Sequence, residues 1–435
     1  MTQPDAGAPT VSVVGGVVGS VVGSVSVAVS VSVVVVSRHR PAALSLCLTA
    51  LTLQDHPGFE IVLVADAGSV GVRPDLPIKR VRFDAANISA ARNAGIMAAA
   101  GEVLAFIDDD AVAEPTWLSR LTAPFADPAV PAATGATRGR DGLRWQVRAE
   151  RMTGNGLAVP VQPWGDSVRL LAPEGGRPVG TLGTNCAFRR DALVELGGFD
   201  PAFAYHLDES DLNMRMAARW PDAPTAVVPM AEVAHGWAGD DRRSASGVPT
   251  DLTQIGRSTA IFCERHGGDS ARASERVRTR LLRLMVSGRL DPLRVAPLMA
   301  TFHAGATGAP RSVCWPKPLS DAPPPPFLTL PGTGPRAHSL LTGWHWQRRR
   351  LRADAVRLSG KGRLVTLVLF SPSILRHRVR FDPAGFWEQA GGLWGPSLPG
   401  DPAVRAWRFR VRAAREAQRL ARTRSLQKLD EIGGV

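Results

Sequence analysis

The chain has 435 residues, enough for two domains or for one large domain with an extension. Its formal net charge of +13 suits anionic partners such as nucleotide phosphates, an anionic membrane face or nucleic acid, and says nothing about fold. The four cysteines are widely scattered without a CxxC pair, so they give no signal of a disulfide framework and favour a reducing cytoplasm.

The N-terminal segment Val11–Val36 consists almost entirely of Val, Gly and Ser and carries no charge. Its length would allow it to span a bilayer, but Gly and Ser interrupt it and the Val/Ser alternation favours a strand. It also lacks the basic start and cleavage site of a secretory signal. Three interpretations stay open: a low-complexity extension leading into the first strand, a membrane anchor, or a mis-assigned start.

Apolar runs and helix-like segments alternate after this extension. Strands are predicted at 31–36, 60–65, 78–83 and 102–107, and helices at 42–54 and 88–101. This order is typical of a parallel α/β sheet with right-handed crossovers. Ligands bind such sheets in the crevice beyond the carboxyl ends of the strands. Polar side chains occupy those ends in this sequence: Ser37, Arg38, Asp66, Asp108 and Asp110.

The second half of the chain divides by composition. The pattern loosens between 111 and 180, and order returns in "GTNCAFRRDALVELGGFD" and "AYHLDESDLNMRMAARW". Beyond these lie a basic helical stretch, a Pro-rich linker and an Arg-rich tail, in which "GRLVTLVLF" is expected to be a strand. The predicted segments are a Val/Gly/Ser extension at 1–29, a catalytic domain at 30–268, a basic helical region at 269–320, a linker at 321–336 and an Arg-rich region at 337–435.

Three adjacent aspartates end the strand "EVLAFI". Asp108 and Asp110 would point to the same side of an extended chain. Hard carboxylate oxygens that converge at a strand end suit Mg²⁺ or Mn²⁺, with water and substrate phosphates as further ligands. The alternative is an acidic loop or helix cap with solvated charges.

A second acidic group, Asp208-Glu209-Ser210-Asp211, precedes an apparent helix. These carboxylates could cap the helix, or one of them could be a general base that takes a proton from an attacking hydroxyl. His235 lies further along, as a structural residue or as a metal ligand. Arg242 and Arg243 could contact a diphosphate or lie in a solvated loop.

In order and spacing, five segments resemble the family 2 glycosyltransferases of the GT-A fold, over roughly Ser30 to Gly239. The segments are "VVVVSRHRP", "EIVLVADAGS", "ISAARNAGIMAAAGEVLAFIDDDAVAEPTWL", "GTNCAFRRDALVELGGFD" and "DESDL". The resemblance implies a Rossmann-like, mostly parallel sheet flanked by helices, here with an extra basic C-terminal region. It also implies transfer of a sugar from a nucleotide-diphosphate donor with inversion, using Mn²⁺ or Mg²⁺.

The resemblance also implies roles for single residues. On the nucleotide side these are Ser37, Arg38, Asp66, Arg92 and Asn93, with Asp108 and Asp110 as the outer members of the DxD motif. Asp110, Asp108 and His235 would hold the metal. Asn185 and the turn Gly197–Asp200 would shape the acceptor side. Apart from the resemblance, Trp117, Arg242 and Arg243 are further candidates for contact with substrate. Glu209 would be the catalytic base, ahead of Asp208 and Asp211. Ala65 and Ala67 depart from the usual pattern of the family, which leaves the choice of nucleotide open.

The function expected from the sequence is therefore sugar transfer to a hydroxyl of a glycan or of a lipid-linked glycan. The alternative is a non-catalytic GT-A-like scaffold whose basic C-terminal region binds an anionic membrane or polymer. Arginines interleaved with Trp and Leu in the tail suit peripheral contact with an anionic membrane, or else a helix with a solvated basic face. Nucleic acid is not the expected partner, because no recognised motif accompanies the tail. We expect a cytoplasmic protein, with the inner face of the membrane as its place of peripheral contact.

Overall fold

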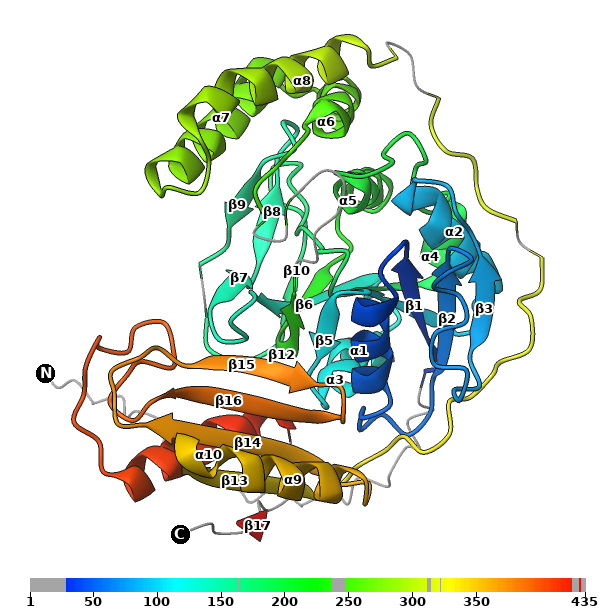
Figure 1. Cartoon of the computed structure of the whole chain (residues 1–435). Coiled ribbons are helices and arrows are strands. Elements are labelled where there is room, and N and C mark those ends of the chain that lie inside the picture. The colour runs from blue at the N-terminus through cyan, green and yellow to red at the C-terminus, as the bar shows by residue number, and fades with distance from the viewer. Residues whose placement is uncertain are drawn as a thin grey trace, which may run out of the picture.

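The computed structural model describes residues 29–162, 164–236, 244, 247–310, 314–320 and 322–424, together with the backbone of 430–431. Its strands form two large sheets and one small two-stranded sheet (Figure 1). The N-terminal extension up to residue 28 lies outside the described residues, so its three interpretations stay predictions, as do the predicted segment boundaries. No helix within the described ranges combines the length and the apolar character that crossing a membrane requires.

One half of the first sheet consists of parallel strands in the order β4-β1-β2-β3. Their bounds are β1 Val31–Ser37, β2 Glu60–Ala65, β3 Lys79–Arg82 and β4 Val103–Asp108. The strands β1, β2 and β4 are almost wholly buried, as in sheets covered on both faces. Ser37 pairs with Ala65, and Val36 pairs with Asp108, so three carboxyl ends meet at one edge. The four strands predicted here are confirmed.

The other half of the first sheet is mixed. The strand β11 runs antiparallel to both β4 and β6, whereas β6 and β12 are parallel. The bounds of this half are β5 Ala111–Ala113, β6 Ala132–Arg138, β7 Trp145–Val147, β10 Arg169–Leu171, β11 Cys186–Arg189 and β12 Thr225–His235. The strands β8 Glu150–Met152 and β9 Ala158–Pro160 form the small separate sheet.

Helices cover both faces of the first sheet. Successive valines of β1 point to opposite faces and therefore pack against different helices. Val33 and Val35 belong to a core with α1 and α3, whereas Val34 belongs to a core with α2, α4 and α5. The bounds are α1 Pro41–Leu51, α2 Ile88–Ala98, α3 Trp117–Thr122 with the 3₁₀ turn η1 Ala123–Ala126, α4 Arg190–Glu195 and α5 Asp208–Arg219. The predicted α/β class, with a sheet flanked by helices, is confirmed.

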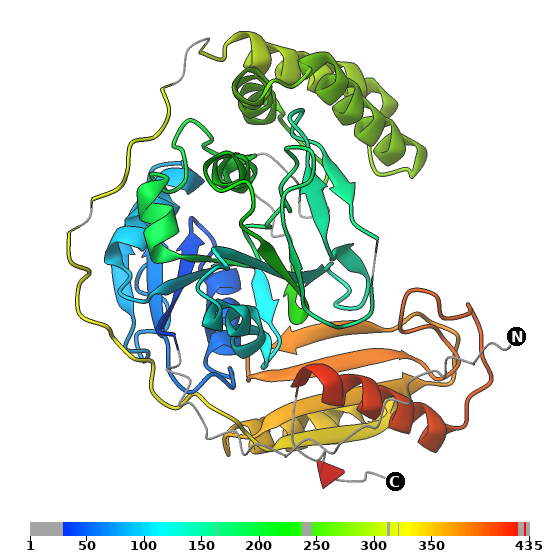
Figure 2. The same cartoon turned by 180° about the vertical axis from the view of Figure 1, so that it is seen from behind.

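Three helices form a group at one end of the molecule (Figures 1 and 2). They are α6 Thr253–His266, α7 Ser270–Val286 and α8 Val295–Thr307, with η2 Pro292–Arg294 before α8. Leu281 and Leu284 of α7 pack with Leu298 and Phe302 of α8. Phe262 of α6 belongs to a further core with residues that precede α5. The basic helical stretch predicted from the sequence is α7.

The Pro-rich stretch at 322–336 contains no helix or strand and passes along the outside of the first sheet (Figure 2). Backbone contacts hold it there. The Leu330 N–H donates to the Phe59 carbonyl at 2.7 Å, and the Gly334 N–H donates to the Gln54 carbonyl at 3.0 Å. Leu330 is buried. This stretch is therefore fixed to the first sheet over part of its length.

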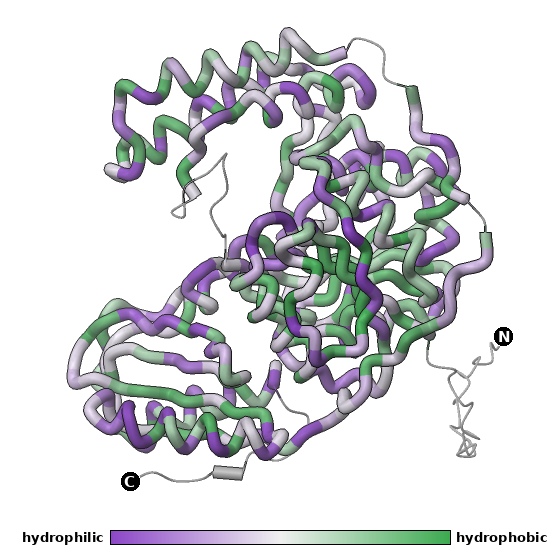
Figure 3. The backbone as a smooth tube through the Cα atoms, turned by 45° about the vertical axis from the view of Figure 1, so that its right-hand side comes forward, coloured by the Kyte–Doolittle hydropathy of each residue, from purple (hydrophilic) through white to green (hydrophobic). Residues whose placement is uncertain are grey.

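The C-terminal region contains the second sheet, in the order β15-β16-β14-β13-β17. Its helices are α9 Arg348–Ser359, after η3 His345–Gln347, and α10 Phe409–Arg424. The bounds of its strands are β13 His338–Trp344, β14 Leu364–Ser371, β15 Arg378–Asp382, β16 Phe386–Gly392 and β17 Asp430–Glu431. Leu367 packs on the side of α9 and Val368 on the side of α10. Figure 3 shows both hydrophobic and hydrophilic stretches in this region. The strand predicted in "GRLVTLVLF" is confirmed as β14.

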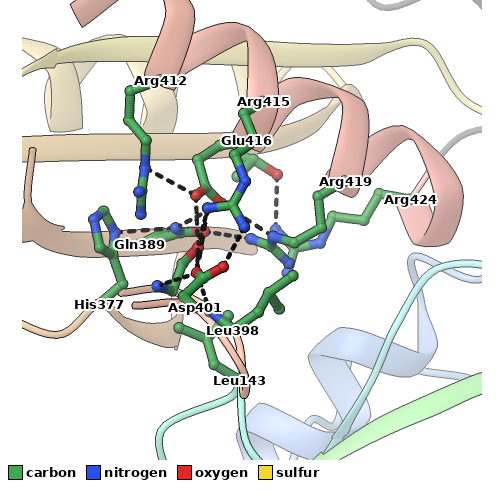
Figure 4. Close-up of polar contacts among 12 residues, drawn as sticks. Leu143, His377, Gln389, Leu398, Asp401, Arg412, Arg415, Glu416, Arg419 and Arg424 are labelled. Atoms are coloured by element: carbon green, nitrogen blue, oxygen red, sulfur yellow. Dashed lines mark hydrogen bonds and ion pairs between the residues drawn. The ribbon is translucent and has the colours of Figure 1, made fainter. Parts of the chain in front are cut away.

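Several arginines of the tail helix α10 are paired inside the C-terminal region (Figure 4). Glu416 accepts ion pairs from Arg412 at 3.1 Å and from Arg419 at 3.0 Å. Arg415 pairs with Asp401, and Leu420 is fully buried in the core of the second sheet. One face of the tail helix is therefore occupied by its own region of the protein.

A buried ion pair joins the C-terminal region to the first sheet. Arg424 contacts both carboxylate oxygens of Glu114, at 2.6 and 2.8 Å. Thr116 Oγ1 donates to the Thr423 carbonyl at 2.8 Å, and the Val379 N–H donates to the Asp141 carbonyl at 2.8 Å. The C-terminal region is thus attached close to the strand that follows the three aspartates.

Candidate active site at the strand ends

Asp108, Asp110 and His235 converge at the carboxyl end of β4. One possible ligand atom from each lies within 4.8 Å of the others. His235 Nε2 is 3.2 Å from Asp110 Oδ1 and 3.8 Å from Asp108 Oδ2. The antiparallel pairing of His235 with Ala111 explains this proximity, because it brings the end of β12 beside the residue that follows the aspartates. The structure therefore brings together the three residues for which the sequence predicted a metal site.

The donor set fits a divalent cation. Two carboxylates and one imidazole are ligands that Mn²⁺ accepts, and the site leaves room for phosphate oxygens. His235 Nδ1 lies 3.1 Å from Gln146 Oε1. Since that amide oxygen can only accept, Nδ1 carries the proton and Nε2 is the nitrogen turned toward the carboxylates.

Asp109, between these two aspartates, points into the protein and is 0% exposed. Ser37 Oγ donates to its Oδ2 at 2.6 Å, and Arg40 Nη2 lies 2.8 Å from its Oδ1. Burial raises the pKa of Asp109 to about 7, although the Arg40 guanidinium opposes this shift. Arg40 also approaches Asp110 at 3.4 Å. Arg40 is thus one of the cations that offset the repulsion among the three carboxylates.

Arg92 of α2 is the second such cation. It is 4% exposed and forms a close ion pair with Asp208. Its guanidinium group also lies 3.4 Å from the Asp108 carboxylate and 3.8 Å from the Glu209 carboxylate. Burial raises the pKa of Asp208 well above its ordinary value, and the neighbouring Glu209 raises it further against the influence of Arg92. The Glu209 side chain is 24% exposed, whereas that of Asp208 is 4% exposed. Of these two carboxylates, Glu209 is the one accessible to an acceptor.

Asp211, the third predicted catalytic candidate, lies one helical turn further along α5 and is 0% exposed. It contacts Arg215 at 2.7 Å, Arg265 at 3.0 Å and His266 at 3.0 Å. These contacts connect α5 to α6 and favour a structural role.

Two cavities open at the strand ends. The larger, of about 1000 Å³, is lined by Asp108, Asp110, Glu209 and His235 and, on the far side, by residues of α7. The smaller, of about 310 Å³, is lined by Ser37, Arg38 and Asp108. Tyr205 lines both. Asp108 also lines both cavities, so a ligand that extends from the smaller cavity into the larger one would pass beside its carboxylate.

Arg38 and Asp66, also expected on the nucleotide side, make local contacts, and of the two only Arg38 lines the smaller cavity. Arg38 Nε donates to the Asp84 carbonyl at 3.1 Å. Asp66 accepts from the N–H groups of His39 at 2.8 Å and Gly68 at 2.9 Å. Desolvation opposes the charge of Asp66, yet these hydrogen bonds outweigh it and lower the pKa of its carboxyl group. Asp66 thus holds the loop after β1 against the loop after β2.

Asn93, Asn185 and Trp117 also line neither of the two cavities. The Asn93 side chain bonds the backbone of Phe199, with Nδ2 donating at 2.7 Å and Oδ1 accepting at 2.8 Å. Asn185 Oδ1 accepts from Trp117 Nε1 at 2.8 Å, and both side chains are fully buried. Asn93 therefore fixes the predicted Gly197–Asp200 turn, and the other two join elements of the first sheet. Arg242 and Arg243 lie outside the described residues.

Sequence reasoning missed Arg40, Gln146 and the α7 wall of the larger cavity. Arg40 could have been predicted from the sequence, since it lies three residues after Ser37 in "SRHRP". Gln146 and α7 carry no local signal, because they reach the site only through the folding of distant segments.

Comparison with known proteins agrees with this geometry. Residues 32–197 match the family described as glycosyl transferase family 2. An N-acetylglucosaminyl-diphospho-decaprenol L-rhamnosyltransferase of Mycobacterium tuberculosis is 34% identical over 113 residues, which are 25% of this chain and 35% of that protein. A glucosyl-dolichyl phosphate glucuronosyltransferase of Haloferax volcanii is 28% identical over 176 residues, 39% of this chain and 54% of that protein. The chain thus spans about a third to a half of the length of these relatives.

Among solved structures, the mannosyltransferase PcManGT from Pyrobaculum calidifontis in complex with GDP-Man and Mn²⁺ is similar with a TM-score of 0.37 and 16% identity. The similarity covers 64% of this chain and 86% of that one. Over residues 32–197, the chain is thus similar to glycosyl transferase family 2.

Proposed function

We propose that the protein transfers a glycosyl group from a nucleoside-diphosphate sugar to a hydroxyl group of a lipid-linked acceptor, with inversion. The observation that carries this proposal is the convergence of Asp108, Asp110 and His235 within 4.8 Å, at the edge of a cavity of about 1000 Å³ that Glu209 also lines.

A Mn²⁺ or Mg²⁺ ion held by Asp108, Asp110 and His235 would act as a Lewis acid toward the diphosphate leaving group. Arg40 and Arg92 keep the aspartates in place, because each of them contacts two or more carboxylates of the site. The smaller cavity, with Ser37 and Arg38, would take the nucleoside.

Glu209 would act as the general base. In a single displacement, the acceptor oxygen forms a bond to the anomeric carbon while the bond from that carbon to the phosphate oxygen breaks. The acceptor proton passes to the Glu209 carboxylate, and the nucleoside diphosphate leaves with the bonding electrons. A carboxylate helps most as the new bond forms, because the free hydroxyl group has a very high pKa. Asp208 is held by Arg92 and is less accessible, which supports Glu209 over Asp208.

The names of the relatives support a lipid-linked acceptor. One acts on a sugar linked to diphospho-decaprenol and the other on a sugar linked to dolichyl phosphate. The donor sugar and its nucleotide would be identified by experiment.

A thermal-shift screen of nucleotide sugars with Mn²⁺ tests the proposal. We expect at least one of them to raise the melting temperature of the wild-type protein in Mn²⁺ and not in EDTA. Asp110→Ala should abolish the shift. Asp222→Asn is the matched control, because Asp222 is an exposed carboxylate outside the site, and it should keep the shift. If no nucleotide sugar or nucleoside diphosphate stabilised the wild type, the proposal would be wrong and the scaffold alternative would stand.

A further inference from the structure

One wall of the larger cavity carries a row of arginines. Arg272, Arg276, Arg280 and Arg283 of α7 all line it. Their spacing of four, four and three residues places them on one face of the helix. All four side chains are exposed. We call these four residues the α7 arginine row.

The two ends of the cavity differ in charge. The strand-end side carries Asp108, Asp110 and Glu209, whereas the α7 side carries the arginine row. Glu275, the one acidic residue of α7, also lines the cavity and lies 3.8 Å from Arg278. A nucleoside diphosphate held through a cation would lie at the acidic side, next to the smaller cavity. The α7 side of the cavity is therefore basic and suits a second anion, because planar guanidinium groups bind phosphate oxygens well. Arg272 of the row also lies 3.5 Å from Asp269.

The turn after α7 points to an amphiphilic ligand. Val286 is 82% exposed and Leu293 is 83% exposed, the highest values for large hydrophobic side chains among the described residues. Val286 is the last residue of α7, and Leu293 lies in η2, just before α8. The following helix α8 contains no Lys, Arg, Asp or Glu. An exposed apolar end next to a basic helix face is the pattern of an element that contacts lipid.

We propose that the α7 arginine row binds the phosphate or diphosphate group of a lipid-linked acceptor, with Val286 and Leu293 in contact with its hydrocarbon chain. This inference rests on the proposed function, since it names the part of the molecule that recognises the acceptor. It moves the expected lipid contact from the tail helix α10, whose Leu420 is buried, to the α7–α8 pair.

Calorimetric titration with farnesyl diphosphate, inorganic pyrophosphate and farnesol tests the proposal in EDTA, so that a cation at the aspartates does not contribute. We expect farnesyl diphosphate to bind more tightly than either fragment. The double variant Arg276→Ala, Arg283→Ala should weaken both diphosphate probes about tenfold or more, because charge-assisted hydrogen bonds are lost. The double variant Val286→Ser, Leu293→Ser should weaken farnesyl diphosphate and leave pyrophosphate unchanged.

Arg278→Ala is the matched control. Arg278 lies on the same helix, is exposed and does not line the cavity, so its loss should change the affinities by less than about twofold. The lysine variant Arg276→Lys, Arg283→Lys should keep most of the binding, which separates lost charge from a folding defect.

Three results would overturn the proposal. In the first, the arginine double variant binds farnesyl diphosphate like the wild type. In the second, Arg278→Ala weakens binding as much as the double variant, which would indicate unspecific attraction. In the third, the serine variant binds farnesyl diphosphate with unchanged affinity, which would refute the contact of Val286 and Leu293 with the hydrocarbon chain. The proposed function has its own test in Mn²⁺-dependent nucleotide binding, so failure of one is distinguishable from failure of the other.

Discussion

The ion pair between Arg424 and Glu114 allows a quantitative prediction about how the C-terminal region is attached. Both side chains are buried, with Arg424 2% and Glu114 8% exposed. Two hydrogen bonds of 2.6 and 2.8 Å connect them, and the Arg424 guanidinium lies 4.6 Å from the centre of the Trp387 ring. Burial opposes the charge of Glu114, yet Arg424 outweighs it and lowers the pKa of that carboxyl group.

The substitution Arg424→Met would leave a buried carboxylate without its partner. Removing one member of a buried pair costs about 3–5 kcal/mol, most of it because the remaining charge is uncompensated. The double variant Arg424→Met, Glu114→Gln should be less destabilised than Arg424→Met alone, because no ionised group is then left unpaired. The two substitutions should therefore couple by about 2–3 kcal/mol.

Urea-induced unfolding of the wild type, the two single variants and the double variant measures this coupling. Hydrogen exchange of the α10 amides reports on the junction itself, since it detects local opening. Arg410→Met is the control on the same helix, because Arg410 is exposed, and it should change the free energy of unfolding by less than about 0.5 kcal/mol. Coupling near zero, with unchanged exchange in α10, would refute the claim that this pair holds the C-terminal region to the first sheet.

Three further predictions concern the site and the C-terminal region. Glu209→Gln should lower kcat by about 10²–10⁴-fold, the usual contribution of a general base, and leave donor binding intact; unchanged turnover in a coupled assay would place the base elsewhere. Gln146→Ala should weaken Mn²⁺ binding by about 10–100-fold, because Gln146 Oε1 lies 3.1 Å from His235 Nδ1 and orients the imidazole ring. Equal Mn²⁺ affinities of the variant and the wild type in a titration would refute this orienting role. Stability should also fall in acid. Burial lowers the pKa of His377 to about 4 from 6.5. For Glu416, burial opposes its charge, but Arg419 and Arg412 lower its pKa to about 2 from 4.5. In both cases the unfolded state binds the proton first as the pH falls, so the contribution of His377 to stability is lost from about pH 6.5 downward and that of Glu416 from about pH 4.5 downward. Between pH 6.5 and 4 His377 should account for about 3 kcal/mol, and urea midpoints of His377→Asn should show a flatter slope than the wild type.

The sequence was most informative where the signal is local. The β-branched run that became β1 and the apolar run ending at Asp108 required only their own composition to be recognised as strands. The polar residues at their ends followed from the rule that parallel strands meet at one edge. His235 was harder, because its place depends on the pairing of β12 with β5, and a family resemblance was needed to single it out.

What the sequence could not show depends on tertiary partners. Asp109 had no predicted role, because only the fold shows that it points inward to Ser37 and Arg40. Asn185 and Trp117 were expected at the substrate and instead bond each other in the core, a contact that no local pattern indicates. The tail had the composition of a membrane-binding helix, yet its leucine packs against a second sheet, of which the sequence indicated one strand. A basic helix looks the same in sequence whether its apolar side meets lipid or protein.

We propose above all that the strand-end carboxylates support cleavage of a nucleotide sugar. Release of nucleoside diphosphate from the donor found in the screen, measured with and without Mn²⁺, tests it most directly. We predict metal-dependent release by the wild type, no release by Asp110→Ala, and strongly reduced release by Glu209→Gln. Equal release by Asp110→Ala, or release that persists in EDTA, would contradict it.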